Sequence, residues 1–405
     1  MRRIFDGNKD NCAFLIIVFS IFITSFIALL VFYLFVFSRL AFYDLKTSSP
    51  FNRSEPTQPP SHTHEDIRAR GTSESANQPS VSVIICAKNE LEHLKKFLPS
   101  ILAQEYPEFE VLVVNDNSTD GSKQWLNDFL KQHTHLRVIE NDTSEKNLLG
   151  KRSALKKGIE AARYELILLT DADCQPATNQ WIRLMSGAVQ QENEIVLGFS
   201  PCFEKFGFLN GFIRYENFLT ALYYLSFTLA KMPYMGVGRN LLYRTSVTTT
   251  IGALEHHSSL ISGDDDLTVN RIATGRNTTL MIHPNAHVFT VSPKSLRAFI
   301  HQKRRHYSTG FHYQSQHQLV LGTLYGSQIL FNVTAIALLI NGFMLLPMIS
   351  IFIIKNILQT LLYGKAMRKL NVHNLWIFTP VFDLCMSAFF LTLSGLSLFK
   401  TKTWK

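Results

Sequence analysis

Three long stretches with almost no charge constrain this chain more than any other feature. Ala13–Phe37 has no Asp, Glu, Lys or Arg over 25 residues, Leu319–Ile354 has none over 36, and Asn374–Phe399 has a single aspartate. A helix needs about 20 apolar residues to cross the hydrocarbon core of a bilayer. The 36-residue stretch is long enough for two such helices, with a turn at Asn341-Gly342. The sequence therefore predicts four membrane spans, with three as the alternative count. They lie at 13–37 and at about 320–341, 343–362 and 375–398.

Basic residues flank the region between the first and second spans. Three follow the first span, at Arg39, Lys46 and Arg53, and Lys303, Arg304 and Arg305 precede the second. Because basic flanks stay on the cytoplasmic side, we expect the central region to be cytoplasmic and the protein to reside in the inner or plasma membrane. Basic residues within the tail at 1–12 argue weakly for the opposite orientation. The net charge of +9 is attributed to these flanks and not to nucleic-acid binding, for which no motif is present.

Two features describe the segment around the first span. Its apolar block is too long for a cleaved signal peptide and no clean small-residue cleavage site follows, so we interpret it as a retained anchor. The following linker, 38–80, holds five prolines and seven serines within 47–80, and this part is predicted to be disordered. Five scattered cysteines without a CxxC pair fit a reduced compartment and argue against a cysteine metal cage.

An alternation of apolar strands and amphipathic helices begins at Val81. Strands are predicted at 81–86, 109–114, 137–140, 165–170 and 194–199, with helices at 90–104, 121–132 and 149–163. Such a pattern predicts an α/β domain, here 81–310, with a mostly parallel sheet covered on both faces and followed by the membrane region 311–405. Ligands of such sheets bind beyond the carboxyl ends of the strands, which directs attention to the loops there.

The loop after the second predicted strand reads NDNSTDGS. Ser118 and Asp120 precede a helix, where such residues commonly cap free N–H groups, and capping explains Asp120. Capping does not explain Asn115 and Asp116, whose polar groups could hydrogen-bond a base or a ribose. We therefore expect Asp116 to contribute to a binding site.

The fourth predicted strand ends on two like charges, Asp171 and Asp173. Alternate residues of an extended segment project to the same side, so both carboxylates can face one point. A divalent cation such as Mg²⁺ or Mn²⁺ prefers oxygen ligands and commonly bridges to phosphates. Two solvated loop aspartates would be the preferred interpretation of an isolated DxD, but its place at a strand end favours a metal site.

Three further groups of residues could complete a transfer site. Lys151 could balance the charge of a diphosphate, although it could equally belong to a solvated basic helix. The GDDDL stretch holds Asp264, Asp265 and Asp266, one of which could accept a proton from an acceptor hydroxyl. Gln302 and Arg305 share a helical face and could reach a diphosphate, whereas Lys303 and Arg304 are interpreted as a positive membrane flank.

With these residues identified, the chain resembles a membrane-bound family 2 glycosyltransferase of the GT-A fold, the group that contains cellulose, chitin and hyaluronan synthases. The resemblance covers about residues 79–310 and rests on six motifs in order. They are CAKNE, NDNSTD where the family has DDxSxD, DAD, MGVGRNLLY, GDDDL, and QKRRH where the family has QxxRW.

The resemblance implies a role for each motif. It implies that Ala87, Asn89, Glu90, Asp116, Lys151, Asp171, Gln302 and Arg305 bind the nucleotide-sugar. It implies that Asp173, with Asp171, binds the metal, and that a GDDDL aspartate is the base. The family's ED-x-DL form points to Asp264 and its GDD form to Asp265, with Asp264 narrowly favoured. Gly238, Asn240, Asp266 and His306 are implied to lie on the acceptor side.

One departure from the family pattern concerns the polymer. His306 replaces the tryptophan that stacks under the acceptor sugar in processive enzymes, which puts polymer synthesis in doubt. An aromatic segment at 203–224 is either an interfacial helix that brings lipid or glycan to the site or a buried core helix.

The sequence thus predicts inverting transfer of a sugar from a nucleotide-sugar, by analogy a UDP-sugar, to a glycan or lipid-linked hydroxyl for cell-surface or extracellular polysaccharide synthesis. The alternatives are single-sugar transfer to a lipid carrier and a non-catalytic nucleotide-sugar sensor or scaffold.

Overall fold

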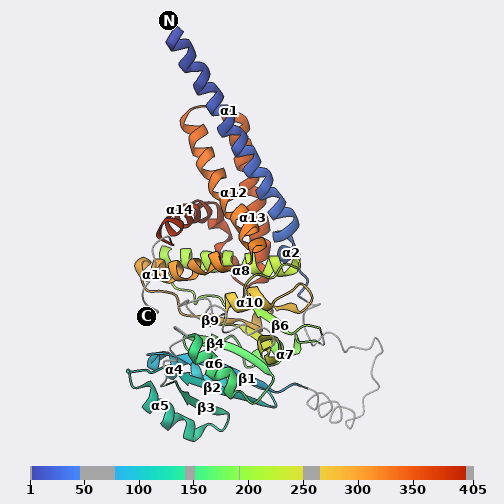
Figure 1. The fold of residues 1–405 in the computed structure, drawn as a ribbon, viewed down its shortest axis with the longest axis vertical. Coiled ribbons are helices and arrows are strands. Elements are labelled where there is room, and N and C mark those ends of the chain that lie inside the picture. Colours follow the sequence, from blue (N-terminus) through green and yellow to red (C-terminus); the bar gives the residue numbers. More distant parts are fainter. Residues whose placement is uncertain (1, 46–77, 142–150, 191, 250–264, 398–405) are drawn as a thin grey trace, which may run out of the picture.

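A computed structural model describes residues 2–45, 78–141, 151–190, 192–249 and 265–397. Figure 1 shows an α/β domain at one end of the molecule, long helices rising from the other end, and a layer of helices between them.

A seven-stranded sheet forms the centre of the α/β domain. Its strand order is β3-β2-β1-β4-β7-β6-β8, and only β7 runs antiparallel to its neighbours. The five predicted strands are confirmed, and they correspond to β1 to β4 and β6. The strands are β1 Val81–Ala87, β2 Phe109–Asn115, β3 Leu136–Glu140, β4 Leu166–Asp171, β6 Ile195–Gly198, β7 Leu241–Arg244 and β8 Thr278–Met281. A second, two-stranded sheet pairs β5 Cys174–Pro176 with β9 Val288–Thr290.

The strands form because both of their faces are buried. β1 is buried at all seven positions, and alternate residues enter two separate cores. Val83 and Ile85 face Leu94 of α4 (Leu91–Leu102) and Trp181 of α7 (Trp181–Gly187). Ile84 faces the side of α6 (Arg152–Ala161). α5 (Ser122–Phe129), followed by the short 3₁₀ helix Leu130–Gln132, connects β2 to β3. This is the doubly covered sheet that the sequence predicted.

The layer between sheet and long helices consists of α8 (Phe208–Leu229), α10 (Asp266–Ile272) and α11 (Leu296–Tyr307) (Figure 1). Most of α8 is buried, so the aromatic segment at 203–224 is mainly a core helix. Lys303 of α11 forms an ion pair with Glu216 of α8, whose carboxylate is almost fully buried. Lys303, which we interpreted as part of a positive membrane flank, therefore also has a structural partner, because a buried carboxylate needs such a cation. The short elements α9 (Thr245–Thr249) and the 3₁₀ turns Pro284–Ala286 and Ser308–His312 complete the domain.

Within the described ranges, four helical segments are long and apolar enough to cross a membrane. They are Asn11–Ala41, Ser315–Ile340, Leu345–Lys369 and His373–Leu393. The first comprises most of α1 (Arg2–Val31), a π-helical stretch at Phe32–Phe37 and α2 (Ser38–Ala41). The others are α12 (Ser315–Ile340), α13 (Leu345–Lys369) and α14 (Thr379–Ser397), which follows the 3₁₀ turn η6 (His373–Phe378).

The predicted turn within the long uncharged stretch is present between α12 and α13. Gly342 has a φ of +64° there, a conformation that glycine adopts readily.

The single aspartate of the last stretch, Asp383 of α14, accepts hydrogen bonds from Lys355 (2.7 Å) and Gln359 (2.6 Å) of α13 and from Gln328 (2.6 Å) of α12. Three long helices are thus joined by one buried carboxylate.

Gly158 allows α6 to approach the sheet closely. A Cβ atom at this position would lie 2.7 Å from Cγ2 of Ile84 and 3.1 Å from Cγ2 of Val114, both of which belong to the central strands. The absence of a side chain therefore sets the distance between this helix and the sheet.

We expect Gly158→Ala to lower the thermal-unfolding midpoint of the detergent-solubilised protein, because overpacking of a core costs about 1–3 kcal/mol. Gly211→Ala in α8 is the matched control, since its added Cβ would meet only Phe382 at an ordinary 3.4 Å. Equal midpoints for the two variants would contradict this account of the α6 packing.

Candidate functional site

The loops after β1 and β2 hold each other in place. Asn89 adopts a φ of 55°, its N–H donates to Oγ of Ser118 (2.9 Å), and its Oδ1 accepts from the N–H of Thr119 (2.8 Å). Asp120 accepts from the N–H groups of Leu91 (2.9 Å) and Ser122 (3.1 Å), which begin α4 and α5. The predicted capping role of Asp120 is confirmed, and one carboxylate serves two helices.

Asp116 lies at the carboxyl end of β2 and is nearly buried. Its Oδ1 accepts from Nδ2 of Asn141 (2.8 Å), its Oδ2 pairs with Nζ of Lys88 (3.3 Å), and its N–H donates to the carbonyl of Ala87 (2.8 Å). Glu90 of the same rim contacts Nδ1 of His93 at 2.5 Å. Four of the eight residues that the resemblance implies for the nucleotide-sugar thus end or follow two adjacent strands, β1 and β2. They are Ala87, Asn89, Glu90 and Asp116.

Lys151 provides the first positive charge for the aspartate pair. Its Nζ lies 2.5 Å from Oδ1 of Asp171, and the two side chains remain 17% and 32% exposed. Burial alone would lower the pKa of Lys151, but the nearby carboxylates of Asp171 and Asp265 outweigh it and hold that pKa well above its usual value. Burial raises the pKa of Asp171, but the charge and hydrogen bond of Lys151, together with the charges of Arg239 and Arg305, lower it overall, so this carboxyl stays ionised. The solvated-helix interpretation of Lys151 is therefore wrong.

Asp173 lacks such a cation of its own. Burial and the neighbouring charge of Asp171 raise the pKa of Asp173, and its one recorded hydrogen bond within the described residues comes from the thiol of Cys174 (3.4 Å). Ligand atoms of Asp171, Asp173 and Cys174 all lie within 4.8 Å of one another. Burial raises the pKa of the Cys174 thiol well above its ordinary value, so it stays neutral. The two carboxylates therefore fit a hard divalent cation, and the thiol does not.

Arg239 is a site residue that sequence reasoning missed. β7 runs antiparallel to β4 with Leu241 opposite Leu169, so residues just before β7 meet residues just after β4 at the same edge of the sheet. The guanidinium accordingly opposes the effect of burial on the pKa of Asp173 and adds to the lowering of that of Asp171. Its position inside the MGVGRN motif was the available signal, but the antiparallel strand that brings it there was not predicted.

Asp265 is held by the same loop. Its Oδ2 accepts from the N–H of Gly238 (3.0 Å), and a Cβ at Gly238 would lie 2.0 Å from that oxygen. Its Oδ1 is buried without a hydrogen-bond partner among the described residues. Burial raises the pKa of Asp265, Asp171 adds to the rise, and Lys151 opposes it. Asp264, the narrowly favoured base, lies outside the described residues.

Two residues assigned to the acceptor side have structural partners instead. Asp266 accepts from Thr309 (2.6 Å), Tyr313 (2.9 Å) and the N–H of Leu267 (2.9 Å). Asn240 is fully buried, where it accepts from Nε1 of Trp181 and donates to two backbone carbonyls. Because these contacts use both oxygens of Asp266 and both polar atoms of Asn240, we correct the two assignments to structural roles.

α11 brings its polar face toward the aspartate pair. Arg305 lies close enough to Asp171 to contribute to the lowering of its pKa, and Gln302 stands one turn earlier on the same helix. Part of His306 remains exposed to solvent. Partial burial of its ring and the positive charges of Lys303 and Arg305 lower its pKa well below the ordinary value. His306 is therefore neutral near pH 7.

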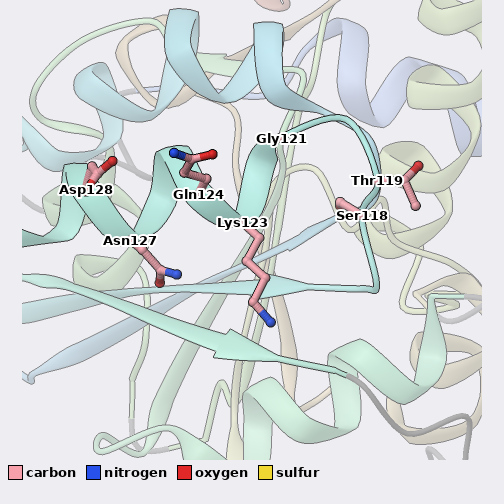
Figure 2. Close-up of a pocket in the computed structure, with 7 residues that line it drawn as sticks. All are labelled: Ser118, Thr119, Gly121, Lys123, Gln124, Asn127 and Asp128. Atoms are coloured by element: carbon pink, nitrogen blue, oxygen red, sulfur yellow. The ribbon is translucent and has the colours of Figure 1, made fainter.

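A surface pocket opens on the outer side of α5, next to the loop after β2 (Figure 2). It is lined by Ser118, Thr119, Gly121, Lys123, Gln124, Asn127 and Asp128. None of the carboxylates that surround Lys151 and Arg239 lines it. We therefore do not place the reaction there.

Comparison with known proteins agrees with this geometry. Residues 82–252 match the family described as Glycosyl transferase family 2. This part of the chain therefore carries a domain that matches that family. It is 30% identical over 195 residues to glycosyltransferase AglE of Haloferax volcanii, and 34% identical over 101 residues to a poly-beta-1,6-N-acetyl-D-glucosamine synthase of Staphylococcus epidermidis. These matches cover 46% and 25% of this chain and 59% and 23% of the relatives, so the chain spans less than two thirds of either one.

The fold resembles a solved mannosyltransferase, PcManGT of Pyrobaculum calidifontis, in complex with GDP-Man and Mn²⁺. The TM-score is 0.54 over 91% of this chain and 98% of that one, at 18% identity. A likeness at this identity concerns the fold alone, and it confirms the predicted GT-A architecture.

The contact between Gly238 and Asp265 generates a prediction. We expect Gly238→Ala to reduce turnover by about 10²-fold, because the new methyl group displaces the Asp265 carboxylate and a displacement of about 1 Å costs that much. The control is Gly310→Ala, whose Cβ would meet nothing within 4 Å. Initial rates with a nucleotide-sugar would measure both, and an unchanged Gly238→Ala rate would contradict the positioning of Asp265 by this loop.

Proposed function

We propose that this protein is an inverting glycosyltransferase that moves a sugar from a nucleotide-sugar, by analogy a UDP-sugar, to an acceptor hydroxyl at the cytoplasmic face of a membrane. The observation that carries the proposal is the meeting of Asp171, Asp173 and Asp265 with the cations Lys151, Arg239 and Arg305 at one edge of the sheet. Acidic groups for a metal and a base beside cations for a leaving diphosphate are what such a transfer requires.

The donor nucleotide would lie over the carboxyl ends of β1 and β2. Asp116 and Asn89 present polar groups there, and Ala87 is the last residue of β1. Asn89 and Asp116 are already fixed by hydrogen bonds to neighbouring loops, so the pocket is preorganised. Lys88, next to Asp116, is an additional cation on this rim that the sequence analysis did not select.

The leaving group would be stabilised by the cations around the aspartates. Negative charge builds up on the nucleotide diphosphate as the glycosidic bond breaks, and fixed positive groups lower the energy of that state. Lys151 and Arg305 reach the surroundings of Asp171 from two different parts of the chain, and Gln302 adds a neutral donor on the same face of α11. A bound Mg²⁺ or Mn²⁺, held by Asp173 and Asp171, would supply further charge neutralisation at the diphosphate.

Asp265 would act as the base within the GDDDL motif. A general base works best when its pKa is raised toward the working pH, and burial raises the pKa of this carboxyl. The Gly238 N–H holds Oδ2, whereas Oδ1 has no partner among the described residues and can accept the proton of the acceptor hydroxyl. The hydroxyl then attacks the anomeric carbon from the face opposite the diphosphate, in one displacement without a covalent intermediate.

The acceptor is proposed to be a glycan or a lipid-linked sugar used for cell-surface or extracellular polysaccharide. His306 stands where processive relatives have a stacking tryptophan, and its neutral ring can stack or hydrogen-bond. Transfer of one sugar to a lipid carrier is the second candidate, because this tryptophan is missing.

Purified protein with radiolabelled UDP-, GDP- and dTDP-sugars and Mn²⁺ tests the proposal. A ladder of products means a polymer and a single band means one transfer. Absence of both transfer and donor hydrolysis with every donor would leave the non-catalytic sensor or scaffold.

Removal of the proposed metal ligand is the sharpest test of the aspartate pair. We expect Asp173→Ala to abolish metal-dependent turnover, since the remaining carboxylate is already paired with Lys151. Asp128→Ala is the matched control, because that exposed aspartate pairs only with Lys131 at the surface among the recorded ion pairs. Near-normal rates for Asp173→Ala, measured across a Mn²⁺ titration, would refute the metal assignment.

The raised pKa of Asp265 predicts the pH dependence. A base must be deprotonated, so activity is present above its pKa and is lost as the pH falls through it. Because burial raises this pKa, the acidic limb of kcat/KM should lie above the ordinary aspartate value of about 4. Asp265→Asn should remove turnover, and a wild-type profile that stays flat down to pH 4 would argue for another base.

A further inference from the structure

α14 differs from the other three apolar helices in its direction. α1, α12 and α13 rise together from the domain in Figure 1, whereas α14 lies crosswise to them, directly above α8 and α11. α1 and α12 pack along each other, with the rings of Phe22 and Phe331 stacked at 4.7 Å. α14 is therefore apolar like the helices of the bundle, but it runs in the direction of the layer below them.

Ring contacts show that α14 follows this layer and does not leave it. Phe382 and Phe389 both contact the ring of Phe212 in α8, at centroid distances of 6.1 and 5.6 Å. A helix rising straight away from α8 would carry the second ring about 10 Å further than the first, because each residue adds about 1.5 Å. Phe389 also stacks on Phe299 of α11 at 5.2 Å, and Phe390 lies 5.8 Å from Tyr307.

Polar contacts fix α14 against the bundle on a second side. Asp383 binds Lys355 and Gln359 of α13, and Ser387, one turn later, accepts from Nδ2 of Asn332 in α12 at 2.7 Å. The polar residues of α14 are thus buried against protein and not directed at lipid.

The remaining face of α14 is apolar and exposed. Val381, Leu384 and Leu391 are about half exposed, and η6 before the helix exposes Trp376, Ile377 and Phe378. The candidate spans α12 and α13, against which α14 packs, expose apolar residues of their own. A bilayer that surrounds those spans would therefore meet this face at its surface, where tryptophan and phenylalanine side chains are favoured.

Charge after the helix points the same way. Residues 400–405 contain three lysines and no acid, and α13 ends on the basic residues Lys365, Arg368 and Lys369. If α14 crossed the bilayer, these two basic segments would lie on opposite sides. Basic segments prefer one side, the cytoplasmic one.

We infer that α14 lies along the membrane–water interface and does not cross the bilayer, so that only three of the four candidate helices span it. The residues after α14 then stay on the same side as the glycosyltransferase domain. The surface formed by η6 and the outer face of α14 contacts lipid headgroups and the upper acyl chains.

Epitope tags in the full-length protein test this topology. Single tags are placed within 47–80, at Asn341-Gly342 and after Lys405, and sealed membrane vesicles are treated with protease before and after permeabilisation. We expect the tag after Lys405 to be cut together with the tag in 47–80, and the tag at Asn341-Gly342 to show the opposite protection. Any other distribution of the three tags overturns the inference.

A second measurement identifies what covers the exposed face. A spin label on Leu384→Cys, in a background of Cys12→Ser and Cys385→Ser, should collide more with oxygen than with a water-soluble nickel chelate in vesicles. A label on Asp128→Cys in the same background should show the reverse, since Asp128 lies on the exposed surface of α5. Equal water access at both positions, or protection of Leu384 from both reagents by a protein partner, would overturn the contact with lipid.

Discussion

The mutual repulsion of carboxylates at one edge of the sheet is the constraint on which the site depends. Asp171 ends β4, Asp173 follows it closely and Asp265 directly precedes α10, yet the carboxylate of Asp171 lies close enough to raise the pKa of the other two. Lys151 and Arg239 offset part of that repulsion, and they do so from two further elements. The pKa of Asp173 remains raised, and an additional cation beside this carboxyl would lower it. The same electrostatic balance thus stabilises the fold locally and prepares it for a charged ligand.

Much of this arrangement could be predicted from the sequence because its signals are local. Continuous apolar runs such as 81–86 and 165–170 can be buried only as central strands, and the loops that follow them inherit their position from the strand order. Asp171, Asp173 and Asp116 were predicted in this way, and they lie at the carboxyl ends of β4 and β2. Asp120 was identified as a cap because its chemistry is decided by the residues next to it.

The misses have one physical cause, which is packing between segments distant in the chain. β7 is only four residues long and antiparallel to its neighbours, so no local sequence pattern predicted that Arg239 would lie near the aspartates. Asp266 and Asn240 looked like site residues because they stand in motifs, but the buried partners of Asp266, Thr309 and Tyr313, lie more than 40 residues away. Lys303 was interpreted as part of a positive membrane flank, and only the fold places the buried Glu216 beside it.

The ion pair between Lys303 and Glu216 also links the helix that carries Arg305 to the helices next to the apolar bundle. α11 carries Arg305 on one side and is clamped to α8 by this pair, while Phe299 of α11 stacks on α14. The helix that presents Arg305 to the aspartates is thus packed directly against the apolar helix α14. The amphiphile chosen to extract the protein, or the thickness of the lipid around it, therefore acts directly on the geometry of the reacting groups.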